Sequence, residues 1–333
     1  MSLSVNDFIR LREDHPIVDV RSQGEFESGH IRGAINIPLL NNDERVVVGT
    51  AYKMQGQKEA IKEGFRLVGP RLRDIINKTE EASRGKEILV HCWRGGMRSN
   101  NFTEFVRMAG IRSQVLEGGY KAYRHKAMES FLAPLSIVLL AGFTGSGKSE
   151  ILRALKVRGE QVLDLEALAN HKGSAFGGLF MPPQPTTEQF QNELFEEILK
   201  LDLSKRVWVE DESLAIGKIF LPDNFWLRMN QSPLVQMEVS KEIRITRLVK
   251  EYGDADREIF LEIMGRITKK LGGQHFQMAK EKLLAGDMAS TIDILLTYYD
   301  KAYLESMNRR RNRLIKTIEW NGESAIDFTH RLI

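Results

Sequence analysis

Short apolar runs alternate with helical and polar stretches in the first part of the chain. Residues 16–20 and 87–91 are rich in β-branched side chains, and polar or glycine-containing sequence follows each run. Buried strands of a parallel sheet have this pattern. Helical stretches lie between and after the runs, including residues 100–108, so we expect an α/β domain. Residues 41–70 are polar and contain glycine, which predicts an excursion away from the sheet.

The second part repeats this alternation and begins with a stronger strand signal. Residues 135–141 form an apolar run that fits a central strand, and residues 162–165 and 207–209 are further short runs separated by helical patterns. This order predicts a second parallel sheet with crossover helices. We place the boundary near residue 130. The expected domains are residues 1–130 and residues 131–333, the latter with a helical C-terminal part.

The length agrees with two domains, because 333 residues exceed what one hydrophobic core usually organises. Apolar residues make up 42% of the chain and charged residues 28%, a composition typical of soluble globular proteins. The first residues lack the basic and apolar regions of a signal peptide, and the longest apolar run falls short of the ~20 residues of a membrane span. We therefore expect a cytoplasmic protein without membrane contact.

The net charge of +3 argues only weakly for an anionic partner, but basic residues cluster at two places. Residues 309–313 include four arginines. Lys241, Arg244, Arg247 and Lys250 recur at three-residue steps, which would align them along one face of a helix. Each cluster fits a solvated surface, and each also fits a surface that binds nucleic acid phosphates.

Cys92, the single cysteine, follows directly after a predicted buried strand. The segment after it turns through two glycines and returns at Arg98, where we expect a helix to begin. Backbone N–H groups in such a turn point into one concavity and, with the helix N-terminus, stabilise an anion, including the reactive thiolate. The alternative is a buried structural cysteine that packs as a small hydrophobe. The predicted anion loop between Cys92 and Arg98 comprises Trp93, Arg94, Gly95, Gly96 and Met97.

Two groups of enzymes use a loop of this kind. The pattern Cys92-x5-Arg98-Ser99, preceded by His91, matches the protein tyrosine phosphatase signature, in which a thiolate attacks phosphorus and an arginine binds phosphate oxygens. About residues 5–125 also resemble the rhodanese domain. This loop is one residue longer than in typical thiosulfate sulfurtransferases, which leaves room for a larger oxyanion. The segments that carry the rhodanese resemblance are Asp19-Val20-Arg21, Glu25-Phe26, Gly29-His30-Ile31, Gly33-Ala34, Asn36-Ile37-Pro38 and Leu116-Glu117-Gly118-Gly119-Tyr120.

Residues 142–149 form a phosphate-binding loop, Gly-x4-Gly-Lys-Ser, between a strong strand and the helical stretch 150–157. Lys148 adds a positive charge and Ser149 is a predicted Mg²⁺ ligand. Asp211, within an acidic triplet after residues 207–209, is a second predicted ligand, although a solvated strand end explains it nearly as well. The loop recognises a pyrophosphate with its cation, so ATP, GTP or another diphosphate ester fits it. The predicted diphosphate-binding residues are Gly142, Thr144, Gly145, Ser146, Gly147, Lys148 and Ser149.

A rhodanese-like domain joined to a P-loop domain resembles the tRNA 2-selenouridine synthase family over essentially the whole chain. The resemblance implies conversion of the wobble 2-thiouridine of tRNA to 2-selenouridine, with selenophosphate as donor and S-geranyl-2-thiouridine, made from geranyl diphosphate, as intermediate. It also implies Mg²⁺, no tightly bound organic cofactor and an enzyme that supplies selenophosphate. Further matching segments are Gly49-Thr50, Tyr52-Lys53, His171-x-Gly173-Ser174-x-Phe176-Gly177, Gln184-Pro185-Thr186, Glu210-Asp211-Glu212-Ser213, Ile216-Gly217, Leu271-Gly272-Gly273 and Tyr298-Tyr299-Asp300.

This resemblance assigns expected roles to individual residues. Cys92 and Arg98 would be catalytic, with selenium either carried on Cys92 as a selenylsulfide or held in the donor for attack on C2 of the uridine. His171, Gly173 and Ser174 would line a prenyl or nucleoside pocket, although a loop that ends a helix explains them about as well. Tyr298, Tyr299 and Tyr303 would stack on an unpaired base, with packing in the core as the alternative. Arg244 and Arg247, from the basic cluster, would contact tRNA phosphates.

Two other functions fit the same motifs. The first is a phosphatase-like domain coupled to an ATPase, which predicts release of phosphate from aryl phosphates and turnover of ATP. The second is a persulfide relay, in which Cys92 hands sulfur to a partner and the P-loop part is a nucleotide-gated tRNA-binding module.

Overall fold

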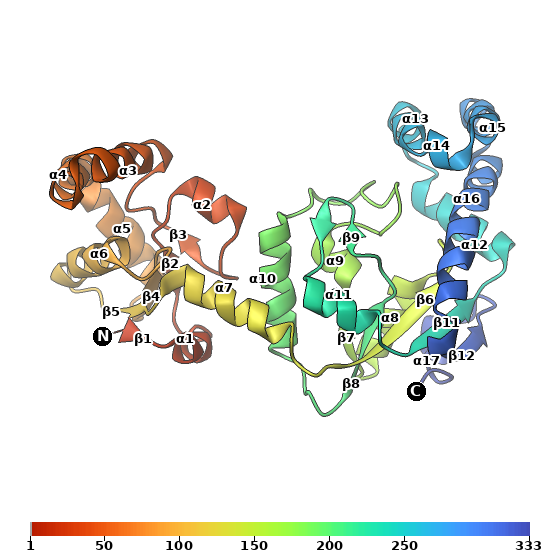
Figure 1. Cartoon of the computed structure of the whole chain (residues 1–333), viewed down its shortest axis with the longest axis horizontal. Coiled ribbons are helices and arrows are strands. Elements are labelled where there is room, and N and C mark those ends of the chain that lie inside the picture. The colour runs from red at the N-terminus through yellow and green to blue at the C-terminus, as the bar shows by residue number, and fades with distance from the viewer. Residues whose placement is uncertain (1) are drawn as a thin grey trace. The chain divides into compact units, whose positions relative to one another are not determined.

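The computed structural model describes residues 2–333 and contains two compact units (Figure 1). The first comprises the residues up to Ser130 together with Gln191–Glu196, and the second comprises Phe131–Phe190 and Glu197–Ile333. Each unit has a five-stranded sheet in which all paired neighbours are parallel. The predicted α/β fold class is confirmed for both units.

The sheet of the first unit has the strand order β1-β5-β4-β2-β3. All four side chains of β4 are buried, as expected for a central strand with an apolar run. Asp19 at the end of β2 pairs in register with His91 at the end of β4, so the carboxyl ends of these strands lie side by side. The strands are β1 (Ser2–Leu3), β2 (Ile17–Asp19), β3 (Ile35–Asn36), β4 (Ile88–His91) and β5 (Ser113–Leu116).

In the first unit, apolar side chains of the helices pack against apolar side chains of the sheet. Val18 and Val90 on the strands share one core cluster with Phe102 and Val106 on α6, and all four are fully buried. The helices are α1 (Val5–Leu11), α2 (Gln23–Ser28), α5 (Leu72–Ser83), α6 (Met97–Met108) and α7 (Gly119–Ser130).

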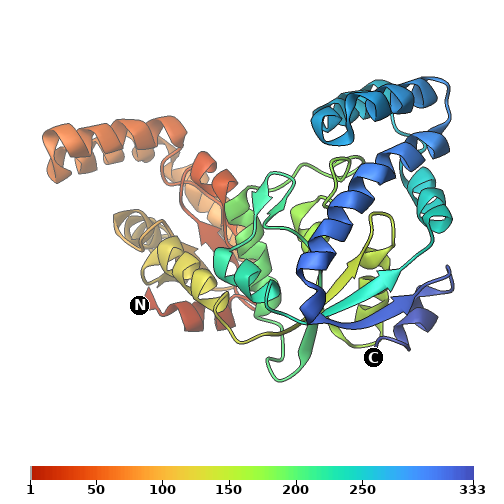
Figure 2. The same cartoon turned by 45° about the vertical axis from the view of Figure 1, so that its right-hand side comes forward.

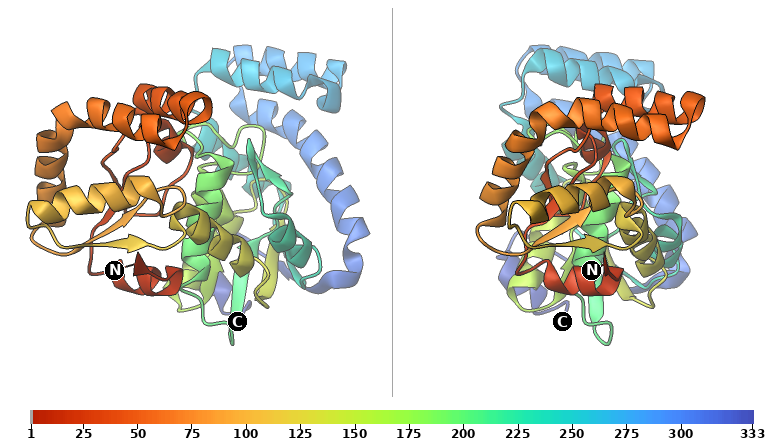
Figure 3. Two further views of the ribbon diagram at one scale, coloured as in Figure 1. Left: turned by 60° about the vertical axis from the view of Figure 1, so that its left-hand side comes forward. Right: turned by 90° about the vertical axis from the view of Figure 1, so that its left-hand side faces the viewer.

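The predicted excursion forms no strand, and most of it is a helical hairpin. Helices α3 (Asn42–Gln55) and α4 (Gln57–Val68) run side by side, and a short 3-10 turn, Gly69–Arg71, leads on to α5 (Figure 3). Asn41 caps α3 reciprocally with Glu44, a favourable way to start a helix. Helix α3 has no fully buried residue; Val48 packs against the core at its edge, while Val46, Val47 and Tyr52 are exposed.

The second unit places its strongest apolar strand, β6, at the centre of its sheet. The strand order is β12-β11-β6-β8-β7, and Leu140 and Ala141 of β6 are fully buried. A separate antiparallel pair is formed by β9 (Ala215–Ile216) and β10 (Ile219–Phe220). The strands of the main sheet are β6 (Ser136–Gly142), β7 (Gln161–Leu163), β8 (Arg206–Glu210), β11 (Leu234–Glu238) and β12 (Leu314–Glu319).

The helices of the second unit include a helical part with its own core. Phe260, Met264, Leu283 and Leu296 belong to this core, and Figure 2 shows the long α16 running beside the helices that supply it. The helical part consists of α12 (Lys241–Tyr252), α13 (Arg257–Arg266), α14 (Thr268–Leu271), α15 (Gly273–Leu284) and α16 (Met288–Arg309), followed by the 3-10 turn Arg311–Arg313. The remaining helices are α8 (Lys148–Val157), α9 (Leu165–Ala169), α11 (Asp223–Met229), α17 (Ala325–Thr329) and α10 (Thr187–Ile198), whose residues Gln191–Glu196 belong to the first unit.

Across residues 2–333, none of the helices combines the length and the apolar character that a membrane crossing requires.

Candidate functional site

The loop after Cys92 joins the end of β4 to the start of α6. Helix α6 begins at Met97, one residue before the predicted start at Arg98. Gly95 has a φ of 64°, and a Cβ added there would lie 2.6 Å from the carbonyl oxygen of Leu116. Glycine alone permits both the backbone conformation and this close approach. The loop can therefore pack directly against the backbone that follows β5.

Two backbone hydrogen bonds fix the loop to the start of α7. The N–H of Tyr120 donates to the carbonyl oxygen of Cys92 at 2.8 Å, and the N–H of Lys121 donates to that of Trp93 at 2.9 Å. Both carbonyl oxygens are therefore paired within the fold. Trp93 and Met97 remain exposed at the surface of the loop.

Cys92 is buried, with 3% of its surface exposed, and its Sγ lies 3.3 Å from Ser99 Oγ on the first turn of α6. Burial acts to raise the pKa of the thiol. Hydrogen bonds from the Ser99 side chain and backbone and from the Arg94 backbone, together with the charge of Arg98, outweigh burial and lower the pKa below its usual value. Such a cysteine is a nucleophile because its thiolate is populated closer to neutral pH.

Arg98 is held by a carboxylate rather than left free beside the thiol. Its Nη1 lies 2.7 Å from Glu25 Oε2 and its Nη2 lies 3.2 Å from Glu25 Oε1. Arg45 of α3 contacts the same carboxylate at 3.1 Å. Glu25 thus positions the guanidinium at the mouth of the loop and ties the hairpin to it.

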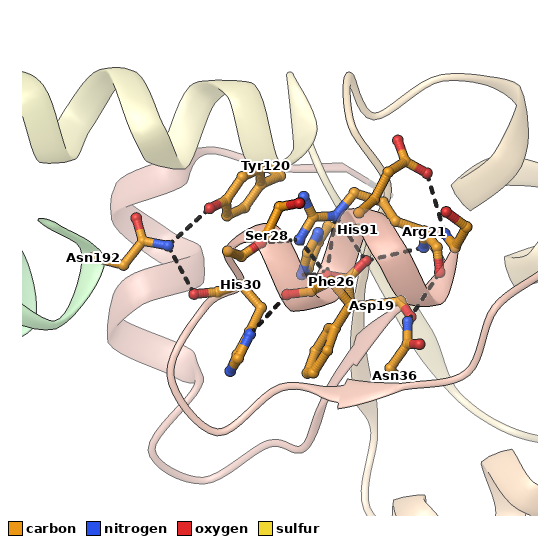
Figure 4. Close-up of polar contacts among 12 residues, drawn as sticks. Asp19, Arg21, Phe26, Ser28, His30, Asn36, His91, Tyr120 and Asn192 are labelled. Carbon is orange, nitrogen blue, oxygen red and sulfur yellow. Dashed lines mark hydrogen bonds and ion pairs between the residues drawn. The ribbon is translucent and has the colours of Figure 1, made fainter. Parts of the chain in front are cut away.

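A buried polar network lies behind the loop at the ends of β2 and β4 (Figure 4). The Arg21 guanidinium donates to Asp19 at 2.7 Å and stacks 3.8 Å from the centre of the Tyr120 ring. The Asn192 amide donates to the Tyr120 hydroxyl at 2.8 Å. Burial acts to raise the pKa of Asp19, but His91 and Arg21 outweigh it and lower that pKa. Because a buried charge is costly unless it is paired, this network fixes the residues that precede Cys92.

The P-loop lies between β6 and α8, and α8 begins at Lys148. Gly145 and Gly147 have φ values of 81° and 83°, which glycine adopts without strain. Lys148 Nζ donates to the carbonyl oxygen of Gly142 at 3.2 Å and so lies back across the loop. Ser146 Oγ is buried and has no hydrogen-bond partner within the described chain. The loop therefore presents a cation and an unsatisfied hydroxyl to a bound oxyanion.

The acidic residues around the P-loop pair with other side chains of the chain, and Asp211 also lines the P-loop cavity. Asp211, a predicted Mg²⁺ ligand, forms a bidentate ion pair with Arg310, and its Oδ2 lies 2.7 Å from Nη2. The Ser149 hydroxyl instead donates to Glu166 at 2.6 Å. Among residues 2–333, no three His, Cys, Asp or Glu side chains are gathered closely enough to hold a metal ion.

Two further carboxyl groups beside the P-loop have raised pKa values. Burial raises the pKa of Glu212 to about 8, with the Glu166 charge acting in the same direction and Lys148 opposing it. Burial and neighbouring carboxylates raise the pKa of Glu210 well above its usual value. Glu212 also packs closely against Gly173, where an added Cβ would lie 2.7 Å from its carboxylate. Glu212, which lines the cavity around the P-loop, therefore holds its proton up to about pH 8, and a bound cation would favour the loss of that proton.

A cavity of about 470 Å³ surrounds the P-loop and falls in the size range of small-molecule sites. Ser174 and Arg247 line this cavity, as do the P-loop residues from Thr144 to Ser149 and Gly142. His171 and Tyr298 do not line it. Tyr299 and Tyr303 from the same helix as Tyr298 do.

Two of the four basic residues of α12, Arg244 and Arg247, form ion pairs with other elements. Arg244 is buried and forms a bidentate ion pair with Asp300, both contacts at 2.8 Å. Arg247 contacts Glu150 at 2.6 Å and stacks on Trp320. The three-residue spacing of Arg244 and Arg247 therefore serves ion pairs with other elements, and it does not mark a solvated helix face. Lys250 of the same helix is exposed, as are Arg309 and Arg311.

Sequence reasoning missed Glu25 and Glu166 as site residues, and within the acidic triplet 210–212 it singled out Asp211 rather than Glu212. Glu25 lies inside the rhodanese-like signature, but nothing in the sequence links it to Arg98. Glu212 follows Asp211 directly in the sequence. Because neighbouring side chains of an extended segment point in opposite directions, the sequence could have indicated that Asp211 and Glu212 have different surroundings. Glu166 carries no local signal.

Comparisons with known proteins agree with this description. Residues 4–126 match the family described as the rhodanese-like domain, and residues 135–329 match the tRNA 2-selenouridine synthase AAA domain. Fold and site together define a two-domain enzyme, with a rhodanese-like cysteine centre and a P-loop centre. Within this class, the chain belongs to the tRNA 2-selenouridine synthase family, which confirms the resemblance found in the sequence.

Two relatives with similar sequences over nearly the whole chain support the same assignment. The chain is 33% identical to a tRNA 2-selenouridine synthase of Nitrosomonas europaea over 95% of this chain and 94% of the relative. It is 34% identical to one of Bdellovibrio bacteriovorus over 96% of both chains. Among solved structures, the N-terminal domain of a candidate ATP/GTP-binding protein from Clostridium difficile is 41% identical and covers 38% of this chain and 97% of its own, with a TM-score of 0.35.

Proposed function

We propose that this protein modifies tRNA by converting wobble 2-thiouridine to 2-selenouridine in two steps, with geranyl diphosphate used in the first and selenophosphate in the second. The observation that carries the proposal is the presence of two separate anion loops, one containing an activated thiol and one a P-loop. Each loop suits one of the two donors. The family names of the relatives support tRNA as the substrate.

The surroundings of the P-loop support a diphosphate ester with an apolar tail. A small apolar cavity adjoins the P-loop cavity and shares Thr144, Leu248, Tyr252 and Tyr299 with it. Its other lining side chains are Phe176, Phe260, Ile292, Leu295 and Leu296. The lining is mostly apolar, with hydroxyl groups on Thr144, Tyr252 and Tyr299, and so favours an alkyl group over the polar edges of a nucleoside. At about 30 Å³, this cavity holds only a small part of an isoprenoid chain.

In the first step the P-loop stabilises a leaving diphosphate. The tRNA sulfur attacks C1 of geranyl diphosphate, the S–C1 bond forms as the C1–O bond breaks, and diphosphate leaves while the uridine N3 proton is released. Lys148 and the loop amides stabilise the charge that develops on the leaving oxygens. Magnesium fits this site, where Ser149 and Glu166 would hold it and it would neutralise diphosphate charge.

In the second step the Cys92 loop releases selenium from its donor. The Cys92 thiolate attacks phosphorus of selenophosphate, the S–P bond forms as the Se–P bond breaks, and water then hydrolyses the S–P bond to give phosphate. The freed selenide attacks C2 of the uridine, and the geranyl thiol leaves with a proton while N3 regains its own. Arg98 stabilises the phosphoryl oxygens. A selenylsulfide on Cys92 would need a reductant before selenide could leave, whereas this route needs none.

These substrates imply two partners, tRNA and an enzyme that produces selenophosphate. The anticodon of tRNA must reach both centres, and exposed cations such as Arg309 and Arg311 suit its phosphates. Selenophosphate hydrolyses readily in water, so an enzyme that produces it is the expected source.

Mass analysis of tRNA nucleosides tests the proposal, using purified variants with thiolated tRNA, geranyl diphosphate and selenophosphate. Cys92→Ser should accumulate the geranylated nucleoside, and Lys148→Ala should leave 2-thiouridine unchanged. Lys156→Ala, on the same helix and outside the P-loop cavity, is the matched control and should form selenouridine. The same product pattern from the first two variants would contradict the division of labour. Aryl phosphate hydrolysis together with ATP turnover, without any tRNA product, would favour the phosphatase alternative.

A further inference from the structure

An apolar pocket lies beside the Cys92 loop, formed largely by the α3–α4 hairpin. Val48 and Tyr52 of α3, Ile61 and Phe65 of α4, and Met97 of α6 are among its lining side chains. Arg98, the cation of the Cys92 loop, also lines it. The pocket therefore meets the catalytic loop at two consecutive residues, Met97 and Arg98.

The hairpin exposes apolar side chains that its own fold does not use. Tyr52 is 53% exposed, Phe65 is 56% exposed and Met97 is 46% exposed. Two ion pairs to Glu25, from Arg45 on α3 and from Arg98, hold the hairpin and the loop together. An exposed apolar surface fixed in this way next to a nucleophile indicates a binding site for an apolar group.

We infer that this pocket binds the prenyl chain on the sulfur of the modified nucleoside, and so selects the S-prenylated intermediate for the selenium step. The inference rests on the proposed function, because it assigns the leaving group of the second step to this pocket. The chemistry of the site agrees with the assignment. The leaving thiol is apolar and neutral and suits the hairpin side chains, while the phosphoryl oxygens of the donor suit Arg98 and the loop amides.

Placing the chain there has a consequence for catalysis. Prenyl contacts hold C2 of the nucleoside near the loop where selenide is released, and such positioning raises the rate of an otherwise bimolecular attack. A nucleoside with unmodified sulfur makes no contact with the pocket. The enzyme therefore distinguishes substrates by the size of the S-alkyl group rather than by the leaving-group chemistry alone.

The structure offers a matched pair of substitutions for the test. Gly64 of α4 lines the pocket, and a Cβ added there meets nothing within 4 Å. Gly49 of α3 has the same free space but does not line the pocket. Glycine is less favourable than phenylalanine inside a helix, so neither substitution should lower the stability of its helix. Gly64→Phe fills the pocket, and Gly49→Phe is its control. Phe65→Ser, at a half-exposed position, removes one wall instead.

The assay supplies selenophosphate with an RNA hairpin carrying either S-geranyl- or S-methyl-2-thiouridine, so that the P-loop step is bypassed. Wild type and Gly49→Phe should prefer the geranyl substrate, with a kcat/KM at least tenfold higher. Gly64→Phe and Phe65→Ser should lose most of this preference while their rates with the S-methyl substrate stay within about twofold. Retention of the preference in both variants would overturn the inference. Failure of wild type to convert the S-geranyl hairpin would instead overturn the proposed function.

Discussion

The hydrogen bond between Ser99 and Cys92 makes a quantitative prediction about the thiol. Ser99 Oγ lies 3.3 Å from Cys92 Sγ and 3.1 Å from the carbonyl oxygen of Gly96. Its single proton is donated to Gly96 when Cys92 is a thiol, and to sulfur when Cys92 is a thiolate. A hydrogen bond to a charged group contributes about 1.5–3 kcal/mol and a neutral one about 0.5–1.5 kcal/mol. The difference favours the thiolate by about 1.5 kcal/mol.

Because about 1.4 kcal/mol corresponds to a factor of ten, Ser99→Ala should lower the thiolate-to-thiol ratio about tenfold at a given pH. The pKa of Cys92 should move upward, toward its ordinary value. The rate of alkylation by iodoacetamide as a function of pH measures it, and the assay is specific because the chain has one cysteine. Thr103→Val on the same helix is the control, since the buried Thr103 hydroxyl has no hydrogen-bond partner in the described part of the chain. An unchanged or lowered pKa in Ser99→Ala would refute this account of the thiol.

Two further predictions concern the P-loop unit. Folded Glu212 keeps its proton up to about pH 8, while the unfolded chain releases it near 4.5, so the free energy of unfolding contributed by this group falls between these pH values. Glu212→Gln should therefore stabilise the protein more at pH 8.5 than at pH 5, which denaturant titration at both pH values can check. Asp300→Asn leaves buried Arg244 without its carboxylate and should lower the free energy of unfolding by about 3 kcal/mol. Asp293→Asn, at the exposed pair with Lys241, should change it by less than about 1 kcal/mol in the same titration.

The sequence could predict those parts of the fold that depend on local patterns. Apolar runs predicted β4 and β6, because central parallel strands are buried on both faces. The P-loop could be predicted equally well, since its glycines, lysine and serine lie within residues 142–149. The helix after Cys92 was misplaced by only one residue, at Met97 instead of Arg98.

Features that depend on distant residues could not be predicted in this way. The spacing of Arg244 and Arg247 indicates a shared helix face, but whether that face meets solvent or carboxylates depends on Asp300 and Glu150. The carboxylate partner of Ser149, Glu166, lies 17 residues away in the sequence. The apolar pocket beside Cys92 likewise depends on how residues 42–68 pack against α6, for which the polar sequence of that segment gives no signal.

The central claim is that alkylation and selenium transfer occur at two separate centres, and mixing two inactive variants tests it most directly. Purified Cys92→Ser and Lys148→Ala would be combined with thiolated tRNA, geranyl diphosphate and selenophosphate, and the nucleosides would be analysed by mass. The account predicts 2-selenouridine in the mixture, because Cys92→Ser makes the geranylated tRNA and Lys148→Ala consumes it. If the mixture yields no 2-selenouridine although Lys148→Ala converts added geranylated tRNA, or if Lys148→Ala cannot convert it, the account is contradicted.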